Sequence, residues 1–322
     1  MEFGFCPMSS QPQMYSMLML NLRSIRFKKV GTPLYGVGLI WLFLFGIIRD
    51  DVREAEYLAL ARQPQFDCVG QVYSDTAAAG SCVLIHERYV LTAAHVLITS
   101  DVRLDTIVMN GQTMISHVPI NERVADVASI YIHIDGQQVQ AKAIALHPEF
   151  LKNKEEGPCD IALVELEKPF SNIAPAKAYT FADEMDSNVV GVGFGASGKA
   201  GVPDSIFTLS KKIAGENVID KISGPEFEGR KTMLSCDFDD ESRKECNKMG
   251  SPTPRPLEYI CGGGDSGGGL FRQVGEDWFL VGICSGAPIN INQLMKTGYY
   301  GQVMEWTRVS AFTQWINTGI KN

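Results

Sequence analysis

The chain has 322 residues, 45% of them hydrophobic and 20% charged, which is enough for one large two-lobed domain or two ordinary ones. Its net charge of −8 and the lack of any basic run after residue 50 argue against a polyanion such as DNA or RNA as the partner. The 31 glycines and 15 prolines are spread without a repeat, which is typical of many short strands joined by tight turns.

The first expected element is an export segment over residues 1–48. A basic stretch at residues 23–29 is followed by an uncharged stretch of about 19 residues that ends at Ile48. Its densest apolar part, Val37 to Ile48, has the length of a signal-peptide core, while the whole stretch could just span a bilayer as an anchor. Under either alternative the basic residues stay on the cytoplasmic side and the chain after residue 50 is exported. We therefore expect a secreted or periplasmic protein, or one held at a membrane by this segment.

The cysteines agree with export to an oxidising compartment. Cys6 lies ahead of the apolar stretch and is not expected in the mature protein, so an odd number remains and at least one is free or bonded to another chain. The pairing of the others stays open. No two cysteines have the C-x₂-C or C-x₄-C spacing of a zinc site, so we expect neither a metal nor another cofactor. The remaining cysteines are Cys68, Cys82, Cys159, Cys236, Cys246, Cys261 and Cys284.

Residues 49–66 are a charged N-terminal segment in which a short helix or turn is expected before the main body. From residue 67 the pattern changes to short strand-type runs bounded by Gly, Pro, Asn or Asp. About ten such strands, with no amphipathic helices between them, predict antiparallel sandwiches or barrels. The expected strands are Cys68–Tyr73, Cys82–Ile85, Tyr89–Thr92, Ala128–Ile134, Gln138–Ala145, Ile161–Leu166, Val189–Val192, Ile206–Lys212, Trp278–Ile283 and Tyr299–Glu305.

Two further segments break the strand pattern. Residues 215–258 read as long surface loops around one short strand, Thr232–Cys236, and their acidic run is interpreted as a solvated loop face rather than a calcium site. The last element, at about residues 309–318, has apolar residues at helical spacing and is expected to be a helix capped by Ser310.

Three segments carry residues suited to nucleophilic catalysis. They are Tyr89-VLTAAHV with His95, Cys159-DIALVELEKP with Asp160, and Cys261-GGGDSGGG with Ser266. Their order of His, Asp, Ser, with Gly191-VGFG and Trp306-TRVSAFTQWI in support, resembles the trypsin-like serine proteases over about residues 68–319. The resemblance implies an all-β domain at 67–322: two six-stranded antiparallel β-barrels of the chymotrypsin type, in lobes at about 67–175 and 185–305, and a C-terminal α-helix.

The chemistry of these residues supports the resemblance. A serine hydroxyl needs a base to remove its proton at neutral pH, and the imidazole of His95 has a suitable pKa. That imidazole in turn needs an acceptor on its other nitrogen, the role of Asp160. By resemblance, the backbone amides of Gly264 and Ser266 form the oxyanion hole, and Ser285 hydrogen-bonds Asp160. We therefore expect a secreted serine endopeptidase that acts on proteins or peptides through an acyl-enzyme; the alternative is a catalytically silent binding module on the same fold.

The sequence departs from the family pattern in two places. Val96 follows His95 where the family has a cysteine, and Cys82 is displaced by two positions, so the disulfide beside the histidine is expected to be absent. An extra glycine also lies between Cys261 and the serine. The substrate pocket is expected at Tyr259, Ile260, Gly286 and Ala287. No acid occupies its floor, since the nearest carboxylate is Glu258, so we expect a preference for uncharged P1 residues.

A last expectation concerns activation. In the family, cleavage before an Ile-Val-Gly-Gly-like segment frees an amine that pairs with the aspartate before the serine, here Asp265. The look-alike at Val69 lies too close to His95 and is interpreted as the first strand of the body. We therefore hypothesise that signal cleavage near Gly46 frees Ile47 or Ile48 to reach Asp265, because a buried unpaired carboxylate would cost several kcal/mol.

Overall fold

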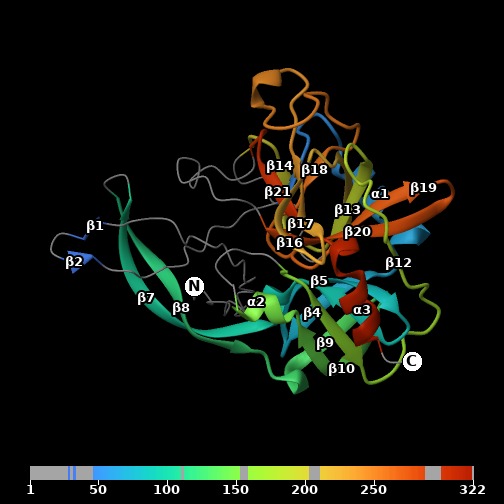
Figure 1. The fold of residues 1–322 in the computed structure, drawn as a ribbon. Helices are drawn as coiled ribbons and strands as arrows, with labels where there is room; N and C mark the ends of the chain where they lie inside the picture. The colour runs from blue at the N-terminus through green and yellow to red at the C-terminus, as the bar shows by residue number, and fades with distance from the viewer. Residues whose placement is uncertain are drawn as a thin grey trace, which may run out of the picture.

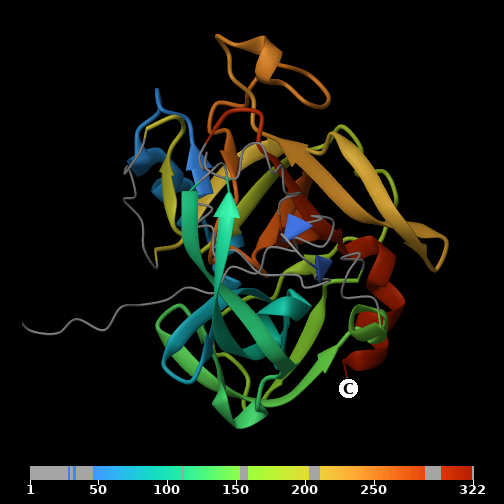
Figure 2. The same ribbon diagram turned by 90° about the vertical axis from the view of Figure 1, so that its left-hand side faces the viewer.

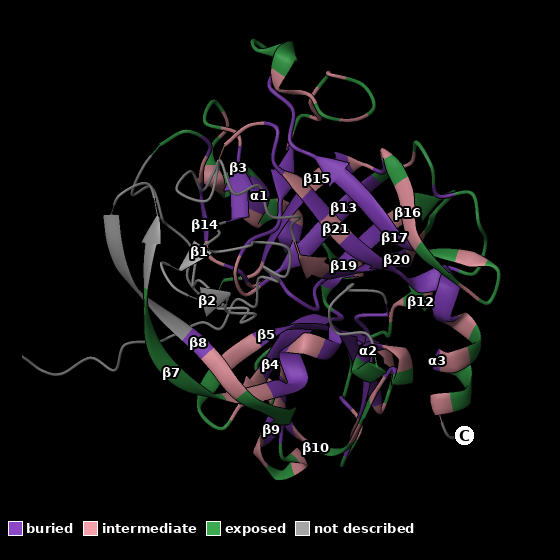
Figure 3. Ribbon diagram, turned by 60° about the vertical axis from the view of Figure 1, so that its left-hand side comes forward, coloured by how far each residue is buried: buried purple, intermediate pink, exposed green. Residues whose placement is uncertain are grey.

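The computed structural model describes residues 28–29, 32–33, 46–109, 112–152, 159–202, 211–286 and 299–320, with the side chains of 107–117 left aside. Strands dominate this part of the chain and form two lobes, the lower and upper halves of Figure 1. Figure 3 shows that the buried residues lie mainly on the strands inside each lobe. The expected all-β class, with a C-terminal helix, is confirmed.

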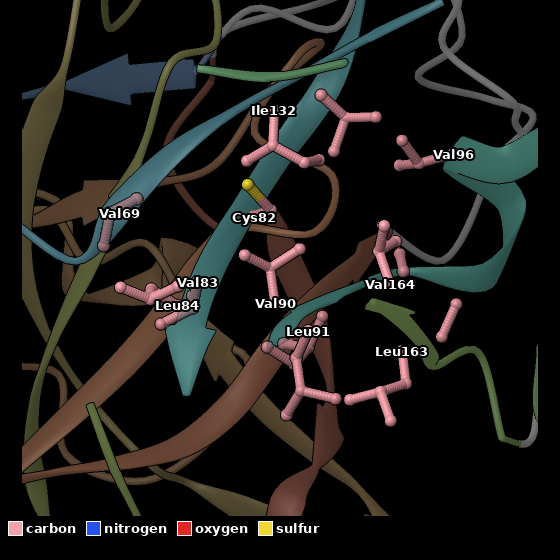
Figure 4. Close-up of a cluster of buried hydrophobic side chains, with 14 of the residues drawn as sticks. Val69, Cys82, Val83, Leu84, Val90, Leu91, Val96, Ile132, Leu163 and Val164 are labelled. Carbon is pink, nitrogen blue, oxygen red and sulfur yellow. The ribbon is translucent and has the colours of Figure 1, made fainter. Parts of the chain in front are cut away.

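The N-terminal lobe is the expected six-stranded barrel. Its antiparallel strands close in the order β10-β11-β6-β5-β4-β9. On β5, β6 and β11 residues of both faces are buried, and Figure 4 shows Val83, Leu91 and Val164 with the sulfur of Cys82 among the packed aliphatic side chains. Each fully buried Val or Leu side chain contributes about 1.5–3 kcal/mol. The strands are β4 (Val69–Ser74), β5 (Ala77–His86), β6 (Tyr89–Thr92), β9 (Ile130–Ile134), β10 (Gln137–Leu146) and β11 (Ala162–Leu166).

The C-terminal lobe is built on an eight-stranded sheet with the order β15-β13-β19-β20-β21-β17-β16, and β12 pairs in parallel with β20. The sheet is larger than the six strands implied by the resemblance because β12 adds from the segment between the lobes and β16 forms where loops were expected. The strands are β12 (Lys177–Ala178), β13 (Asn188–Gly193), β15 (Ile213–Val218), β16 (Lys221–Phe227), β17 (Arg230–Asp237), β19 (Gly269–Val274), β20 (Asp277–Gly286) and β21 (Val303–Arg308).

A small third sheet brings the end of the predicted export segment into the folded body. Strand β3 (Gly46–Ile48) lies between β14 (Ser197–Lys199), to which it is parallel, and β18 (Tyr259–Ile260), to which it is antiparallel. Ile47 and Ile48 are fully buried. The domain boundary predicted after residue 48 therefore falls inside the body, because the backbone of β3 hydrogen-bonds on both sides.

Little of the remaining export segment is described. The short strands β1 (Lys28–Lys29) and β2 (Thr32–Pro33) pair with each other, and residues 1–27, 30–31 and 34–45 lie outside the described part. Among the residues that the structure describes, no helix is long and apolar enough to cross a membrane.

Helices are few and short, and two of them lie where the sequence predicts them. The predicted cap at Ser310 is wrong, because its hydroxyl donates to Glu184 Oε1 at 2.6 Å and α3 begins after Phe312. The segment before the body contains α1, which buries Tyr57 and Ala61, and the chain ends on a 3₁₀ turn that runs into α3. In Figure 1, α3 lies beside both lobes. The helices are α1 (Glu54–Ala61), α2 (Pro148–Lys152) and α3 (Thr313–Gly319), and the 3₁₀ turns are η1 (Pro64–Phe66), η2 (Ala94–Leu97), η3 (Val127–Ser129), η4 (Lys244–Cys246) and η6 (Val309–Phe312).

A long hairpin after the predicted histidine was not expected from the sequence. Strands β7 (Ile98–Met109) and β8 (Gln112–Val124) pair only with each other and project from the barrel as a ribbon, seen from the side in Figure 1 and facing the viewer in Figure 2. Val102 and Leu104 remain exposed on it. A ribbon with little buried surface leaves a weak apolar alternation in the sequence, which explains why it was missed.

Residues 215–258 are more ordered than expected. Besides β16 and β17, the acidic run folds inward, and Asp237, Asp239 and Asp240 are buried. The interpretation as a solvated face is therefore wrong for these three aspartates, whereas Glu241 is exposed as expected. The reason is local: Asp237 accepts hydrogen bonds from the amides of Lys248 and Met249 at 2.5 and 3.0 Å, so the loop wraps around the carboxylate.

Candidate active site

Two of the three predicted catalytic residues pair with each other, and the third lies in a turn that packs against the same edge of the barrel. His95 lies in η2, just after β6 ends at Thr92, and Asp160 lies just before β11 begins at Ala162. Because Thr92 and Ala162 are cross-strand partners, the barrel places the two side chains at one edge. Ser266 comes from the other lobe, in the turn that precedes β19.

His95 and Asp160 form a buried pair. Nδ1 of His95 lies 2.7 Å from Oδ2 of Asp160, and the backbone amide of His95 donates to Oδ1 at 2.9 Å. Ser285 donates its hydroxyl to Oδ2 at 2.7 Å, as the resemblance implied. Thr307 donates to the carbonyl oxygen of Asp160 at 2.9 Å, so side chain and backbone are both held. These contacts set the orientation of the imidazole.

The environment of the pair moves both pKa values. Burial by itself would lower the pKa of His95, but the charge and hydrogen bond of Asp160 outweigh it and raise this pKa. Burial would raise the pKa of Asp160, yet the charge of His95 and the hydrogen bonds from His95 and Ser285 lower it. The aspartate therefore stays ionised, and its charge favours the protonated form of His95.

Ser266 is positioned by backbone contacts with the other lobe. The amide of Ser81 in β5 donates to the carbonyl oxygen of Ser266 at 2.7 Å. The next residue, Gly267, has φ of +85°, and a Cβ there would lie 2.2 Å from both Ser81 O and Thr92 Oγ1. Only glycine allows this approach. Within the described residues no hydrogen bond joins the Ser266 hydroxyl to His95, a contact that often tightens only when substrate binds.

The turn from Gly262 to Ser266, here called the oxyanion loop, has the shape that its predicted role requires. Gly264 has φ of +96°, and the Asp265 amide donates to the Gly262 carbonyl oxygen at 3.0 Å. In the part of the chain that is described, the amides of Gly264 and Ser266 donate to no other group. Two such amides are the donors needed at a developing oxyanion.

Asp265 is fully buried and has three hydrogen-bond donors around it. Oδ1 accepts the amide of Gly195 at 2.7 Å, and Oδ2 accepts the amide of Gly262 at 2.9 Å and the hydroxyl of Tyr259 at 2.5 Å. Burial raises the pKa of Asp265, although these three donors act in the opposite direction. A Cβ at Gly193 or Gly195 would meet this carboxylate within about 2.5 Å, so the glycine-rich segment makes room for it.

The predicted pocket residues divide into two groups. Tyr259 and Ile260 are buried in β18, and the Tyr259 hydroxyl is directed to Asp265 rather than to a pocket floor. Gly286 is partly exposed, and no atom of the described residues lies within 4 Å of the position that its Cβ would occupy. Ala287 lies outside the described residues. Glu258 is buried and turned away, accepting the amides of Arg255 and Asp239.

A cavity of about 50 Å³ opens on the other side of His95. All of its lining comes from the N-terminal lobe and the start of the hairpin, and it includes Ala79, Val96 and Thr99. No residue of the oxyanion loop lines this cavity.

The expected loss of the disulfide next to the histidine agrees with the packing. A Cβ added at Gly80 would lie 2.8 Å from Val96 Cγ2. A glycine and a valine therefore pack together beside the histidine, where no disulfide is present. The seven cysteines in the described part are all free thiols, and Cys82 is buried in the barrel core. Cys261 and Cys284 are both buried and share a thiol hydrogen bond.

Sequence reasoning missed two residues of the site. The fully buried Ser81 donates its hydroxyl to the Gly264 carbonyl oxygen at 2.8 Å and accepts the amide of Phe194 at 3.0 Å. Thr307 holds the backbone of Asp160. Both lie in runs that look like ordinary strands. The one signal in the sequence for Ser81 is that it is a polar residue in a mostly apolar run.

A closed β-barrel lobe, a second β lobe and a C-terminal helix, with histidine, aspartate and serine segments between the lobes, define a serine-protease fold of the chymotrypsin class. The family model described as Trypsin matches residues 59–316, well over half of the chain. The chain therefore belongs to the trypsin family, whose members act on proteins or peptides.

Proposed function

We propose that this protein is an active, exported serine endopeptidase with His95, Asp160 and Ser266 as its catalytic triad. The observation that carries the proposal is the buried His95–Asp160 pair, held by Ser285 and adjoining a serine turn with two uncommitted amides. A silent binding module would have no need of this arrangement of charge and donors.

The reaction follows from the roles of these groups. Ser266 Oγ attacks the scissile carbonyl carbon while His95 Nε2 takes its proton, and the amides of Gly264 and Ser266 bind the resulting oxyanion. The tetrahedral intermediate collapses, the C–N bond breaks, and His95 gives the proton to the leaving amine. Water then attacks the acyl-enzyme, with His95 again as base, and releases the acid and free Ser266.

The surroundings support a preference for uncharged P1 side chains. A pocket that accepts Lys or Arg needs a buried carboxylate at its floor. Glu258, the nearest acid, is occupied by backbone amides, and Tyr259 offers no charge. Among the described residues, no atom fills the Cβ position of Gly286, which leaves room at the pocket wall.

The cavity beside His95 supports a second preference of cleavage, for the residue on the leaving-group side of the scissile bond. Its volume of about 50 Å³ and its lining of alanine, valine and threonine side chains suit a small residue on the leaving-group side. Ala79 and Ala125 leave this space open because their side chains stop at Cβ.

A covalent probe tests the proposed activity. A fluorophosphonate should label the wild-type protein and leave Ser266→Ala unlabelled. It should label Ser171→Ala, a change at an exposed serine that makes no contact with the site, as it labels the wild type. Wild-type protein that is folded but unlabelled would instead favour the silent binding module.

Export is the second part of the proposal. Its support is the uncharged stretch behind a basic segment, together with membership in a family whose members are commonly secreted. Fractionation of cells producing the full chain should place the activity outside the cytoplasm, either free or at the membrane.

A further inference from the structure

The oxyanion loop has internal supports that the family's activation scheme does not require. That scheme supplies a freed amine to Asp265, and cleavage near Gly46 was the expected source. In the structure the Gly46 amide donates to the Ala196 carbonyl oxygen at 2.7 Å. All three groups bound to Asp265 are neutral and belong to the folded body, so the carboxylate is satisfied with the chain uncut at Gly46.

Tyr259 is a rigid donor to Asp265. Its backbone pairs with Ile48 in the three-stranded sheet. Its side chain packs so closely against Gly215 that a Cβ on this glycine would lie 2.1 Å from the Cβ of Tyr259. The hydroxyl reaches Asp265 Oδ2 at 2.5 Å, within the range of a charge-assisted bond. A buried, closely packed side chain keeps its hydroxyl in one position.

Ser81 supports the loop from the opposite lobe. Its hydroxyl donates to the Gly264 carbonyl oxygen and its amide donates to the Ser266 carbonyl oxygen. Gly264 and Ser266 are the two residues whose amides are assigned to the oxyanion hole. Ser81 therefore holds the peptide groups Gly264–Asp265 and Ser266–Gly267, which flank the peptide that carries the Ser266 amide.

We propose that Tyr259 and Ser81 are positioning residues that hold the oxyanion loop in its catalytic shape while the chain upstream of Ile47 is still attached. The inference rests on the proposed protease function. Under it, no freed amine is needed at Asp265. The Tyr259 hydroxyl and a freed amine would occupy the same space beside Asp265, because a Cβ at Gly46 would lie 3.2 Å from this hydroxyl. A new amine at this point would have to compete with that hydroxyl for the carboxylate.

The first test removes single hydroxyls from the full-length chain. Tyr259→Phe keeps the ring and removes the donor, so kcat should fall about 10- to 100-fold, while KM should change less than about twofold. The matched control is Tyr57→Phe, which removes another buried hydroxyl, bonded to the Glu258 carbonyl oxygen and not to Asp265. It should lower the melting temperature without lowering kcat.

Ser81→Ala serves as the second variant, checked for folding by circular dichroism. It should also lower kcat more than it changes KM, and should slow fluorophosphonate labelling of Ser266. Intact mass should show that the active wild-type protein retains residues before Gly46, or is equally active with and without them.

Three results would overturn the inference: wild-type kcat in both Tyr259→Phe and folded Ser81→Ala, an equal loss of kcat in Tyr57→Phe, or activity confined to molecules that begin at Ile47 or Ile48. In each case the wild type is still labelled at Ser266, so the proposed function survives. Failure of wild-type labelling would instead contradict the proposed function itself.

Discussion

Ser285 Oγ lies 2.7 Å from Asp160 Oδ2, the same carboxylate oxygen that lies 2.7 Å from His95 Nδ1. Ser285 belongs to β20 of the C-terminal lobe, whereas Asp160 and His95 belong to the N-terminal lobe. The orientation of the proposed base is therefore coupled to the packing of the two lobes.

This coupling can be measured with Ser285→Ala. Loss of one hydrogen bond to an ionised group costs about 1.5–3 kcal/mol at most, and Asp160 keeps its bonds to His95. We expect kcat to fall about tenfold, far less than on loss of a triad residue. Steady-state kinetics checks this, with the exposed Ser171→Ala as control. A kcat equal to wild type would show that the imidazole does not depend on this contact.

The triad itself should behave as one unit. Ser266→Ala and His95→Ala should each reduce kcat by several orders of magnitude, and the double variant should be little worse than either. Asp160→Asn should fold normally and lose about 10⁴-fold, the magnitude known for this family's triad, because the amide favours the wrong tautomer. Near-additive losses in the double variant would contradict the assignment.

The pH dependence of activity should follow His95. Its pKa is raised by Asp160, and the base must be neutral to accept a proton, so kcat/KM should rise with pH through a value above 6.5. In Asp160→Asn the burial of His95 remains without the compensating charge, so the midpoint should move to lower pH. An ester substrate gives enough rate to measure both profiles. An unchanged midpoint would assign it to another group.

Stability should change with pH in the opposite sense. Burial raises the pKa of Glu258 from 4.5 to about 8 and that of Asp239 from 3.8 to about 7, the charge of Asp237 adding to the latter. The folded state therefore holds these protons more tightly than the unfolded state, and the free energy of unfolding should fall as pH rises from about 4.5 to 8.

Glu258→Gln isolates this effect because the amide cannot ionise. Its melting temperature should decline less than that of the wild type between pH 5 and 8. Glu241→Gln, on an exposed side chain, should track the wild type. Parallel curves for Glu258→Gln and the wild type would show that Glu258 does not titrate in this range.

Cleavage preference tests the two sides of the site together. A peptide library incubated with the mature protein should be cut after uncharged P1 residues and before small P1′ residues, because no acid reaches the pocket floor and the cavity beside His95 is small. Ser266→Ala is the blank that removes cleavage by contaminants. Strong selection for Lys or Arg at P1 would contradict the assignment of Glu258.

Much of the fold and site could be predicted because the signals are local. The strands around His95 and Asp160 are short, mostly apolar runs that are buried in the barrel, and the C-terminal helix carries helical spacing. The bond from Ser285 to Asp160 was predicted by resemblance and agrees with the structure. These features depend on short runs of residues, which a sequence displays directly.

Other features depend on partners distant in the chain. The exposed β7–β8 ribbon has no buried face to leave a pattern, and the acidic run is buried because Asp237 meets amides eleven and twelve residues later. Tyr259 was predicted to line a pocket, but its hydroxyl meets Asp265, and Ser81 reaches Gly264 across the lobes. The sequence by itself determined which residues could do the chemistry. Only the tertiary structure decided what holds them, because hydrogen bonds between distant segments have no periodicity along the chain.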